Sequence, residues 1–482
     1  MNNSPSLTRQ IFRRKPAATL MTEASAEGFG LKRVLGALDL TLLGIGAIVG
    51  AGIFVLTGVA AAKYAGPAIV LSFVVSGFAC AMAALCYAEF AAMIPVAGSA
   101  YSYSYATMGE LVGWIIGWDL VLEYAVGAAA VAVGWSGYLR VILAGLGVQL
   151  PSSLIHAPGS APGAIVNLPA LLIVLVISAI LYIGISESAR LNSIIVSIKL
   201  VVVVLVIVIG GFYIKPANWS PFAPMGWGGV MKGAAVIFFA YIGFDAVSTA
   251  AEEVVNPKRD LPLGILGSLF ACTLLYILVA AVLTGMVPAA AIDLNAPLAS
   301  AFVIRGLNAI SGIISLGAVA GLTSVLLVLL LGQSRIFFAV SRDGLLPAAF
   351  SKVHPKYRTP YIPTTITAIA VGLTAAFLPI QEIAELTNIG TLFAFVLVCA
   401  GVWILRRIEP ELNRPFRTPL VPLVPVLGMF FCAYLMLSLP AVTWIRFFVW
   451  MALGFAIYFG YGRFHSRIAQ ENSAGRAAAS AD

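Results

Sequence analysis

The stretch GIGAIVGAGIF, residues 44–54, places four glycines inside a segment that is otherwise apolar enough to cross a membrane. Each glycine in a helix interior costs about 1 kcal/mol relative to alanine. Two interpretations stay open on these residues alone. Gly46 and Gly50 form a small-residue face for close helix packing, or the helix is unwound at mid-membrane, where irregular backbone survives only beside a cavity or inside protein. A nucleotide-binding fingerprint is excluded, because GIGAIVG has one residue too many for GxGxxG and no soluble strand precedes it.

The composition indicates that lipid is the main solvent of this chain. Of its 482 residues, 61% are hydrophobic and 10% are charged, and the mean hydropathy is +1.01. A soluble protein would carry about 25% charged residues. The apolar runs are continuous and do not alternate with period two, which favours helices over barrel strands. The sequence therefore predicts an all-α integral membrane protein with about 12 transmembrane helices, near residues 38–62, 67–94, 111–142, 168–186, 190–214, 229–250, 263–287, 308–339, 362–379, 381–407, 420–438 and 442–464.

The distribution of the 28 Lys and Arg residues predicts the orientation. Most of them fall on one side of the membrane if both termini are cytoplasmic, as the positive-inside rule requires. We expect cytoplasmic tails at 1–35 and 465–482, no cleavable signal, and a location in a bacterial inner membrane. The net charge of +8 is then a signature of the inner leaflet and does not indicate a nucleic-acid partner.

The cysteines and histidines argue against metal binding and catalysis. The five cysteines lie within or beside apolar spans and form no CxxC, and the three histidines fall in loops or the tail. We expect no metal, no cofactor and no enzymatic activity.

A second interrupted span supports unwinding of the first. The stretch FFAYIGFDAVSTAAEEVVNPKRDLP, residues 238–262, places Gly243 and Asp245 in the middle of a hydrophobic span, five spans after the glycine-rich segment. Interrupted helices at corresponding positions of two halves are typical of inverted-repeat transporters with a site between them. The predicted halves are 36–214 and 226–407, followed by two helices in 408–464. This pairing rests on position and interruption only, because no residue-level repeat joins the halves.

The motifs together resemble the amino acid–polyamine–organocation superfamily and, within it, the bacterial relatives of the cationic amino acid transporters. The resemblance covers residues 33–464, and its other carriers are YAEFAAMIPVAGSAYSYSYATMGE (87–110), WIIGWDLVLEYAVG (114–127), GQSRIFFAVSRDGLLP (332–347) and LTNIGTLFAF (386–395). It implies the leucine-transporter fold with a 5+5 inverted repeat, and secondary transport of amino acids by alternating access.

The same resemblance implies substrate contacts on both interrupted helices. The α-carboxylate would meet backbone N–H groups of Gly50, Ala51 and Gly52, and the α-ammonium would meet carbonyls of Ile48, Phe239, Ala240 and Ile242. Many relatives have Thr or Ser in place of Ala51, so a hydroxyl contact is absent from this chain. Phe239 is either a gate over the substrate or an ordinary packed aromatic residue.

Charged residues inside spans are costly and therefore require a partner or a task. Lys199 either snorkels to the surface or, as the resemblance implies, occupies the sodium position of sodium-coupled relatives and serves proton coupling or replaces sodium. Glu123 and Asp245 are candidates to receive a cationic side chain, carry a proton or balance Lys199, whereas Asp119 is expected to be structural. Thr323 and Ser324 stand where sodium-coupled relatives supply ligands, so a residual sodium site stays open.

The predicted function is secondary active transport, coupled to protons and independent of sodium, of cationic and/or small neutral L-amino acids. The alternatives are exchange of amino acids or polyamines and, from another class, an amino acid sensor that does not transport. Expected partners are the L-amino acid, protons, the lipid bilayer and an unidentified small membrane protein. Side-chain preference would depend on a few pocket residues such as Val126, Leu329 and Thr391.

Overall fold

The computed structural model of this protein describes residues 13–14, 33–95, 99–184 and 189–467. Most of both predicted tails, 1–12 with 15–32 and 468–482, lies outside the described residues. Within the described part the chain is helical and forms no β-strand, only two isolated β-bridges. The prediction of an all-α protein is confirmed.

The helices follow one another with short connections. In the first half of the chain they are α3 (Ala37–Ile48), α4 (Thr57–Ala60), α5 (Ile69–Met93), α6 (Ser99–Thr107), α7 (Glu110–Gly145), α8 (Ser152–Ile155), α9 (Leu168–Ile183) and α10 (Ala189–Gly211). In the second half they are α11 (Gly226–Ile237), α12 (Ala246–Thr249), α13 (Pro257–Met286), α14 (Pro297–Ile304), α15 (Asn308–Arg342), α16 (Tyr361–Phe377), α17 (Ile380–Ile408), α18 (Leu423–Leu437), α19 (Ala441–Ile457) and α20 (Arg463–His465).

Eight helical segments of the described residues are long and apolar enough to cross a membrane. Four shorter apolar helices, α3, α9, α16 and α18, accompany them. The length and hydropathy of these segments support an integral membrane protein, since about 20 apolar residues span the hydrocarbon core. The count of twelve spans stays a prediction.

The first glycine-rich segment is interrupted as the sequence predicts. Helix α3 ends at Ile48, and Val49 follows with an extended backbone (φ −73°, ψ 93°). The chain then resumes as a π-helix over Gly52–Leu56, continues as α4, and forms a second π-helix over Ala61–Ala65. Irregular helix of this kind is frequent at functional sites.

The four glycines of this segment have different tasks. A side chain at Gly44 would meet the Ser268 hydroxyl at 2.5 Å, and one at Gly46 would meet a Val196 methyl at 2.5 Å. Both lie inside α3, and of the two glycines that the packing interpretation names, Gly46 has such a close contact with a neighbouring helix. Gly50 lies in the interruption itself and Gly52 at the first position of the π-helix.

The second interruption lies between α11 and α12. A 3₁₀ turn over Phe238–Tyr241 follows α11, and Ile242 is extended (φ −60°, ψ 134°). Gly243 has φ +115°, a conformation that side chains strongly disfavour. Its α-carbon also faces the backbone of Ala47, so a side chain there would contact the first interrupted helix at about 3.0 Å. The two interruptions are therefore in contact with each other.

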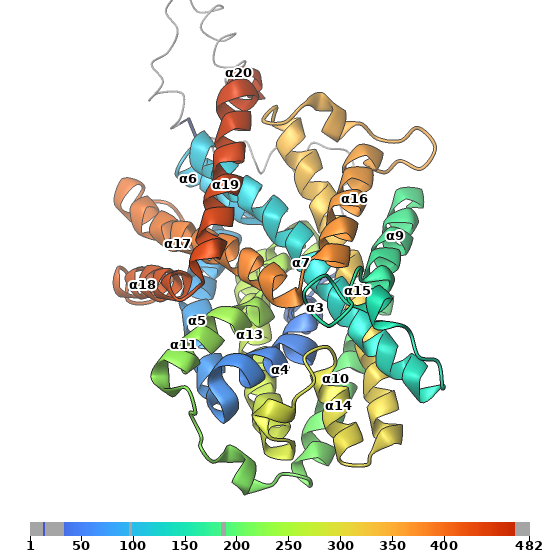
Figure 1. Ribbon diagram of the computed structural model, residues 1–482. Coiled ribbons are helices and arrows are strands. Elements are labelled where there is room, and N and C mark those ends of the chain that lie inside the picture. The colour runs from blue at the N-terminus through green and yellow to red at the C-terminus, as the bar shows by residue number, and fades with distance from the viewer. Residues whose placement is uncertain (1–12, 15–32, 96–98, 185–188, 468–482) are drawn as a thin grey trace, which may run out of the picture.

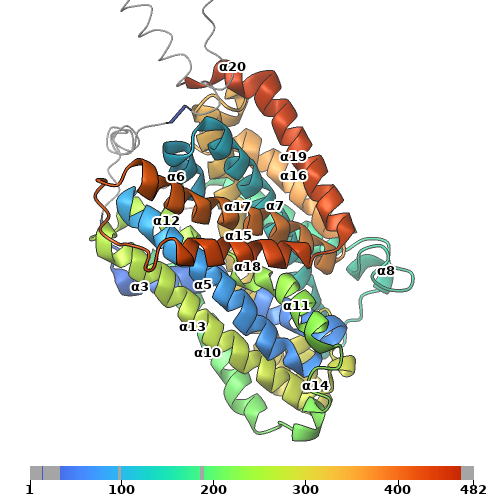
Figure 2. The ribbon, with the colours of Figure 1, turned by 90° about the vertical axis from the view of Figure 1, so that its left-hand side faces the viewer.

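Helices at corresponding positions of the two predicted halves pack against each other. α5 packs on α13, α7 on α15, and α9 on α16. Figure 1 shows α9 and α16 on one flank and α17, α18 and α19 on the opposite flank. In the view turned by 90°, α5 and α13 run side by side (Figure 2). This pairing places the two interrupted helices in the interior, between the paired ones.

Candidate substrate site between the two helix interruptions

A small cavity of about 40 Å³ lies where the two interruptions meet. Eight of the nine residues predicted to contact substrate line it, namely Ile48, Gly50, Ala51, Gly52, Glu123, Phe239, Ile242 and Asp245.

The remaining predicted contact residue, Ala240, does not line the cavity. Its carbonyl oxygen lies 2.8 Å from the hydroxyl of Tyr276 on α13, and the carbonyl oxygen of Ile48 lies 2.9 Å from the same hydroxyl. One buried side chain thus bridges the end of α3 and the turn after α11. Sequence reasoning missed Tyr276. The available signal was a tyrosine inside an apolar span, because a buried tyrosine hydroxyl needs a hydrogen-bond partner.

Other donors meet carbonyl groups near the interruptions. The Asn388 side-chain amide on α17 donates to the carbonyls of Ala235 and Val236, at 2.7 and 2.9 Å. The Tyr138 hydroxyl on α7 donates to the carbonyl of Phe54 in the first π-helix, at 2.6 Å. Backbone groups freed inside a membrane must find such partners, because no bulk water is there to solvate them.

The wall of the cavity that α7 and α15 form is mainly apolar. Val131 on α7 and Val325, Val328 and Leu329 on α15 line it together with Gly127. Of the three residues predicted to set substrate preference, only Leu329 lies on the cavity wall. Val126 and Thr391 are buried but do not line it.

Two carboxylates close another side of the cavity. Glu123 accepts a hydrogen bond of 2.8 Å from the Thr391 hydroxyl, and the Asp245 carboxylate lies beside the backbone amides of Gly243, Asp245 and Ala246. Both side chains are buried. Glu123 therefore has one side-chain donor and, as an ionised carboxylate, keeps further acceptor sites.

Asp119 differs from both of them. It is only 1% exposed, and neither carboxylate oxygen has a hydrogen-bond partner among the described residues. It faces Gly390 on α17, where an added side chain would lie 3.7 Å from Asp119 Oδ1. A buried carboxylate without partners is expensive, and the expectation that Asp119 is structural stays a prediction.

Lys199 reaches the first interrupted helix. Its ammonium Nζ lies 2.8 Å from the carbonyl oxygen of Gly46, and the side chain is fully buried. The snorkelling alternative is therefore wrong. The stem of the lysine fills the space beside Gly321, where a side chain would meet Lys199 Cγ at 2.9 Å.

The hydroxyls considered as sodium ligands lie on α15. Thr323 accepts a 2.9 Å hydrogen bond from the Trp135 indole and donates one of 2.7 Å to the carbonyl of Val319. Ser324 is buried. Among the described residues no group of three or more His, Cys, Asp or Glu side chains could hold a metal ion.

Comparison with known proteins places this geometry in context. Residues 35–458 match the family model described as amino acid permease. The chain is 52% identical over 463 residues to a branched-chain amino acid permease of Bacillus subtilis (strain 168), covering 95% of this chain and 99% of the relative. It is 50% identical over 456 residues to a methylthioribose transporter of the same organism, with 95% and 98% covered. A vacuolar cationic amino acid transporter of Arabidopsis thaliana is 39% identical over 387 residues, with 79% and 64% covered. The resemblance stated from the motifs is confirmed.

Proposed function

Because the chain belongs to the amino acid permease family, we propose that it carries a neutral, apolar L-amino acid across a bacterial membrane by alternating access. The family and the transporter names of the relatives indicate a transporter rather than an enzyme. The eight candidate spans indicate a multi-pass membrane protein. The substrate class, the coupling and the residue roles below are proposals.

The proposed architecture is the leucine-transporter fold with twelve spans. Four shorter apolar helices beside the eight long candidates support that number. The proposed repeats are 36–214 and 226–407, with two further spans in 408–464. The packing of α5 on α13, α7 on α15 and α9 on α16 is the arrangement that such a pseudo-symmetry requires. Both termini are proposed to be cytoplasmic.

The backbone N–H groups at the two interruptions are proposed to orient the substrate. Their place beside the cavity is the observation that supports the proposal most strongly. At the second interruption, the Asp245 carboxylate already lies beside the backbone amides of Gly243, Asp245 and Ala246. At the first, Gly50, Ala51 and Gly52 line the cavity at the start of a new helix. Helix starts carry unsatisfied N–H groups and a positive dipole end, which attract a carboxylate. The substrate α-carboxylate therefore binds at Gly50–Gly52.

The α-ammonium then meets carbonyl oxygens across the cavity. The proposed acceptors are those of Ile48, Phe239, Ala240 and Ile242, two of which contact Tyr276 in this conformation. Each carbonyl has two lone pairs, so the ammonium either shares these oxygens with the tyrosine or displaces it. Phe239, which lies on the cavity wall, keeps its proposed role as a gate.

The side-chain preference follows from the apolar wall. Valine and leucine side chains from α7 and α15 suit an aliphatic substrate. The name of the 52% identical relative, a branched-chain amino acid permease, agrees with this choice. We therefore favour the neutral over the cationic substrates that the sequence left open.

The proposed coupling ion is the proton. Lys199 places a fixed cation on the Gly46 carbonyl, beside the interruption. A buried ammonium and the buried acids Glu123 and Asp245 are groups that can exchange protons when alternating access opens them to water. Transport is therefore proposed to be independent of sodium and driven by a proton gradient.

The test is uptake by the purified protein in proteoliposomes. Radiolabelled leucine, alanine and arginine are compared under an imposed pH gradient, with and without sodium. We expect leucine to accumulate when the outside is acidic, with no effect of sodium. Accumulation of arginine alone, or uptake that needs sodium, contradicts the proposal. Uptake that needs an internal amino acid instead of a pH gradient identifies exchange.

A second candidate substrate comes from the comparison. A relative with 50% identity bears the name methylthioribose transporter, and the apolar wall at α7 and α15 accepts a thioether as well as an aliphatic side chain. A thioether sugar has neither carboxylate nor ammonium, so its transport would not require the backbone groups of the interruptions. Competition of unlabelled methylthioribose against leucine uptake separates the two candidates.

A further inference from the structure

A second hollow lies away from the cavity, on the flank of the molecule where α18 ends beside the start of α11. It has a volume of about 500 Å³, within the range of about 300–1,000 Å³ typical of small-molecule sites. Its walls come from the second π-helix, α11, α17 and the connection from α18 to α19. It shares no lining residue with the substrate cavity, so it is a separate site.

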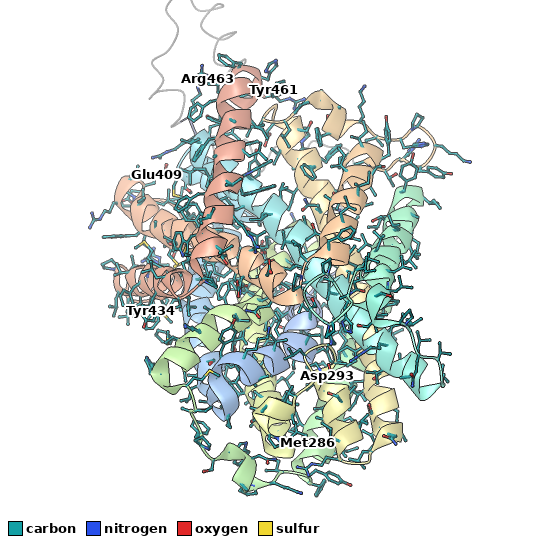
Figure 3. The ribbon with its side chains drawn as sticks, in the orientation of Figure 1. Met286, Asp293, Glu409, Tyr434, Tyr461 and Arg463 are labelled. Atoms are coloured by element: carbon teal, nitrogen blue, oxygen red, sulfur yellow. The ribbon has the colours of Figure 1, made fainter. Side chains whose placement is uncertain are left out.

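The rim of this hollow combines aromatic and apolar side chains that face outward. Trp227 is 61% exposed and Leu437 is 72% exposed, and Tyr434 is also exposed. Figure 3 shows Tyr434 on the flank of the molecule, at α18. Tyrosine and tryptophan gather at the boundary between lipid headgroups and hydrocarbon. The rim thus has the composition of a surface that contacts lipid at that boundary.

Two opposite charges line the same hollow without forming an ion pair with each other. Lys232 lies on α11, one and a half turns after the helix begins, and its side chain is exposed. Glu385 on α17 is 5% exposed. The ion pairs found among the described residues include none between these two side chains.

The carboxylate of Glu385 is held in place and retains acceptor capacity. Oε1 accepts a 2.9 Å hydrogen bond from the Gln381 amide, and Oε2 accepts one of 3.2 Å from the Thr443 hydroxyl. Gln381 in turn accepts a 2.6 Å hydrogen bond from Lys63 and contacts the Tyr64 hydroxyl. An ionised carboxylate has about four acceptor sites, so about two remain for a ligand.

We propose that this hollow binds the headgroup of a phospholipid that carries a primary amine, as in phosphatidylethanolamine. The phosphate lies against the Lys232 ammonium, the headgroup ammonium donates to Glu385, and an acyl chain follows Leu437 along the exposed side of α18. A lysine beside a groove between membrane helices suits a lipid phosphate. A headgroup without N–H groups, such as phosphocholine, leaves Glu385 without a donor. A free amino acid carries the same pair of charges but makes no use of the apolar rim.

The position of this site couples it to the transport machinery. Val236 of the hollow lies on α11, two residues before the 3₁₀ turn that leads into the second interruption, and its carbonyl accepts from Asn388. Tyr64 lies on the segment that continues the first interrupted helix. A lipid held here touches both interrupted helices and α17 at once.

Native mass spectrometry of the delipidated protein tests this proposal. The protein is mixed with equal amounts of phosphatidylethanolamine, phosphatidylcholine and phosphatidylglycerol with matched acyl chains. We expect about tenfold more ethanolamine than choline adduct, the ratio that corresponds to one charge-assisted hydrogen bond. Lys232→Gln is expected to reduce the ethanolamine and choline adducts alike, because both lipids carry the phosphate that Lys232 contacts, whereas Glu385→Gln is expected to reduce the ratio to near one. Lys215→Gln, which changes an exposed lysine outside the hollow, serves as the control and keeps both the adduct amounts and the ratio.

Three results would overturn the proposal. Equal ethanolamine and choline adducts show that Glu385 does not select a primary amine, and preferential phosphatidylglycerol adducts show that phosphate alone is recognised. In a parallel arm, delipidated protein is titrated with radiolabelled leucine. A second equivalent of leucine that is lost in Lys232→Gln identifies an amino acid site instead. Because Lys232 is exposed, the substitution does not endanger folding.

Discussion

The interruption at Val49–Ala51 and the one at Ile242–Asp245 both free backbone groups from helical hydrogen bonds, but different charges meet those groups. At the first, a buried ammonium from Lys199 takes the carbonyl of Gly46. At the second, the buried carboxylate of Asp245 lies beside the backbone amides of Gly243, Asp245 and Ala246. The Tyr276 hydroxyl lies between them and contacts one carbonyl of each.

This difference explains why two similar interruptions are not interchangeable. In the proposed binding mode, Asp245 is the anion at the second interruption, so the substrate carboxylate binds the amides of the first. Lys199 is the cation on α3, before the first interruption. The charges of the substrate are proposed to pair with the remaining backbone groups. Substitutions at each interruption test this assignment.

The largest effect is expected where the two interruptions touch. A methyl group at Gly52 would overlap the backbone α-carbon of Ala240, whereas one at Gly50 would lie 3.4 Å from the methyls of Val325. We expect Gly52→Ala to abolish leucine uptake, because backbone cannot give way as a side chain can. Gly50→Ala should lower the free energy of unfolding by about 1–3 kcal/mol, the range for overpacking.

The measurement is uptake normalised to the folded protein recovered after size exclusion. Gly50→Ala is the matched control, since it adds the same methyl group two residues earlier. Equal uptake by both variants would show that contact between the interruptions is not required for transport.

Next in size is the loss of the buried cation at Lys199. Lys199→Met leaves the Gly46 carbonyl without its donor, which costs about 1–3 kcal/mol for a buried group. We expect lower thermal stability, retained leucine binding by thermal shift, and uptake that no longer depends on the pH gradient. Lys199→Gln keeps a hydrogen-bond donor without a charge and should recover stability but not pH dependence. A wild-type pH profile in either variant would refute the coupling role.

Removal of the bridge between the interruptions should have a smaller effect. Tyr276→Phe deletes one hydroxyl that serves two carbonyls, and we expect a loss of about 1–2 kcal/mol of stability without substrate. If the ammonium competes with this hydroxyl, leucine should stabilise the variant more than it stabilises the wild type. Tyr138→Phe is the control, because its hydroxyl donates to the carbonyl of Phe54 in the first interrupted helix. Equal stabilisation by leucine in all three proteins would show that the ammonium binds elsewhere.

The smallest effect on stability is expected in the loop between α13 and α14, which contains Asp293. Burial of Asp293 raises the pKa of its carboxyl. Arg140 at 2.8 Å and the amides of Asn295 and Ala296 lower the same pKa by a larger amount, so the net shift is downward. A carboxyl with a lowered folded-state pKa stabilises the protein above its unfolded pKa of about 3.9, and the stabilisation is lost as the pH falls through the folded value.

The loop with Asp293 leads to Pro297, which packs on Gly58 of α4. We expect Arg140→Gln to lose thermal stability modestly at neutral pH and to match the wild type at low pH, where the carboxyl is protonated in both. Both partners are about one-third exposed, so solvent screening limits the effect. Melting curves between about pH 3 and pH 7 measure it. A constant difference at every pH would show that Arg140 acts by packing and not by charge.

The sequence by itself determined the features that depend on local pattern. Length and apolarity of the runs decide that the chain is helical and embedded in lipid, because backbone groups in hydrocarbon must be satisfied within a helix. Glycine and acidic residues inside apolar spans predicted both interruptions, since these residues destabilise a membrane helix wherever they stand. A lysine in the middle of an apolar run was likewise bound to require a partner.

Only the tertiary structure decided which groups meet. It assigned Gly44 and Gly46 to packing, turned the Ala240 carbonyl to Tyr276, placed Asn388 on the carbonyls before the second interruption, and left Asp119 without a partner among the described residues. These outcomes depend on how helices far apart in the chain cross. A side chain's contacts across helices depend on the rotation and depth of its neighbours, which no periodicity within one span encodes.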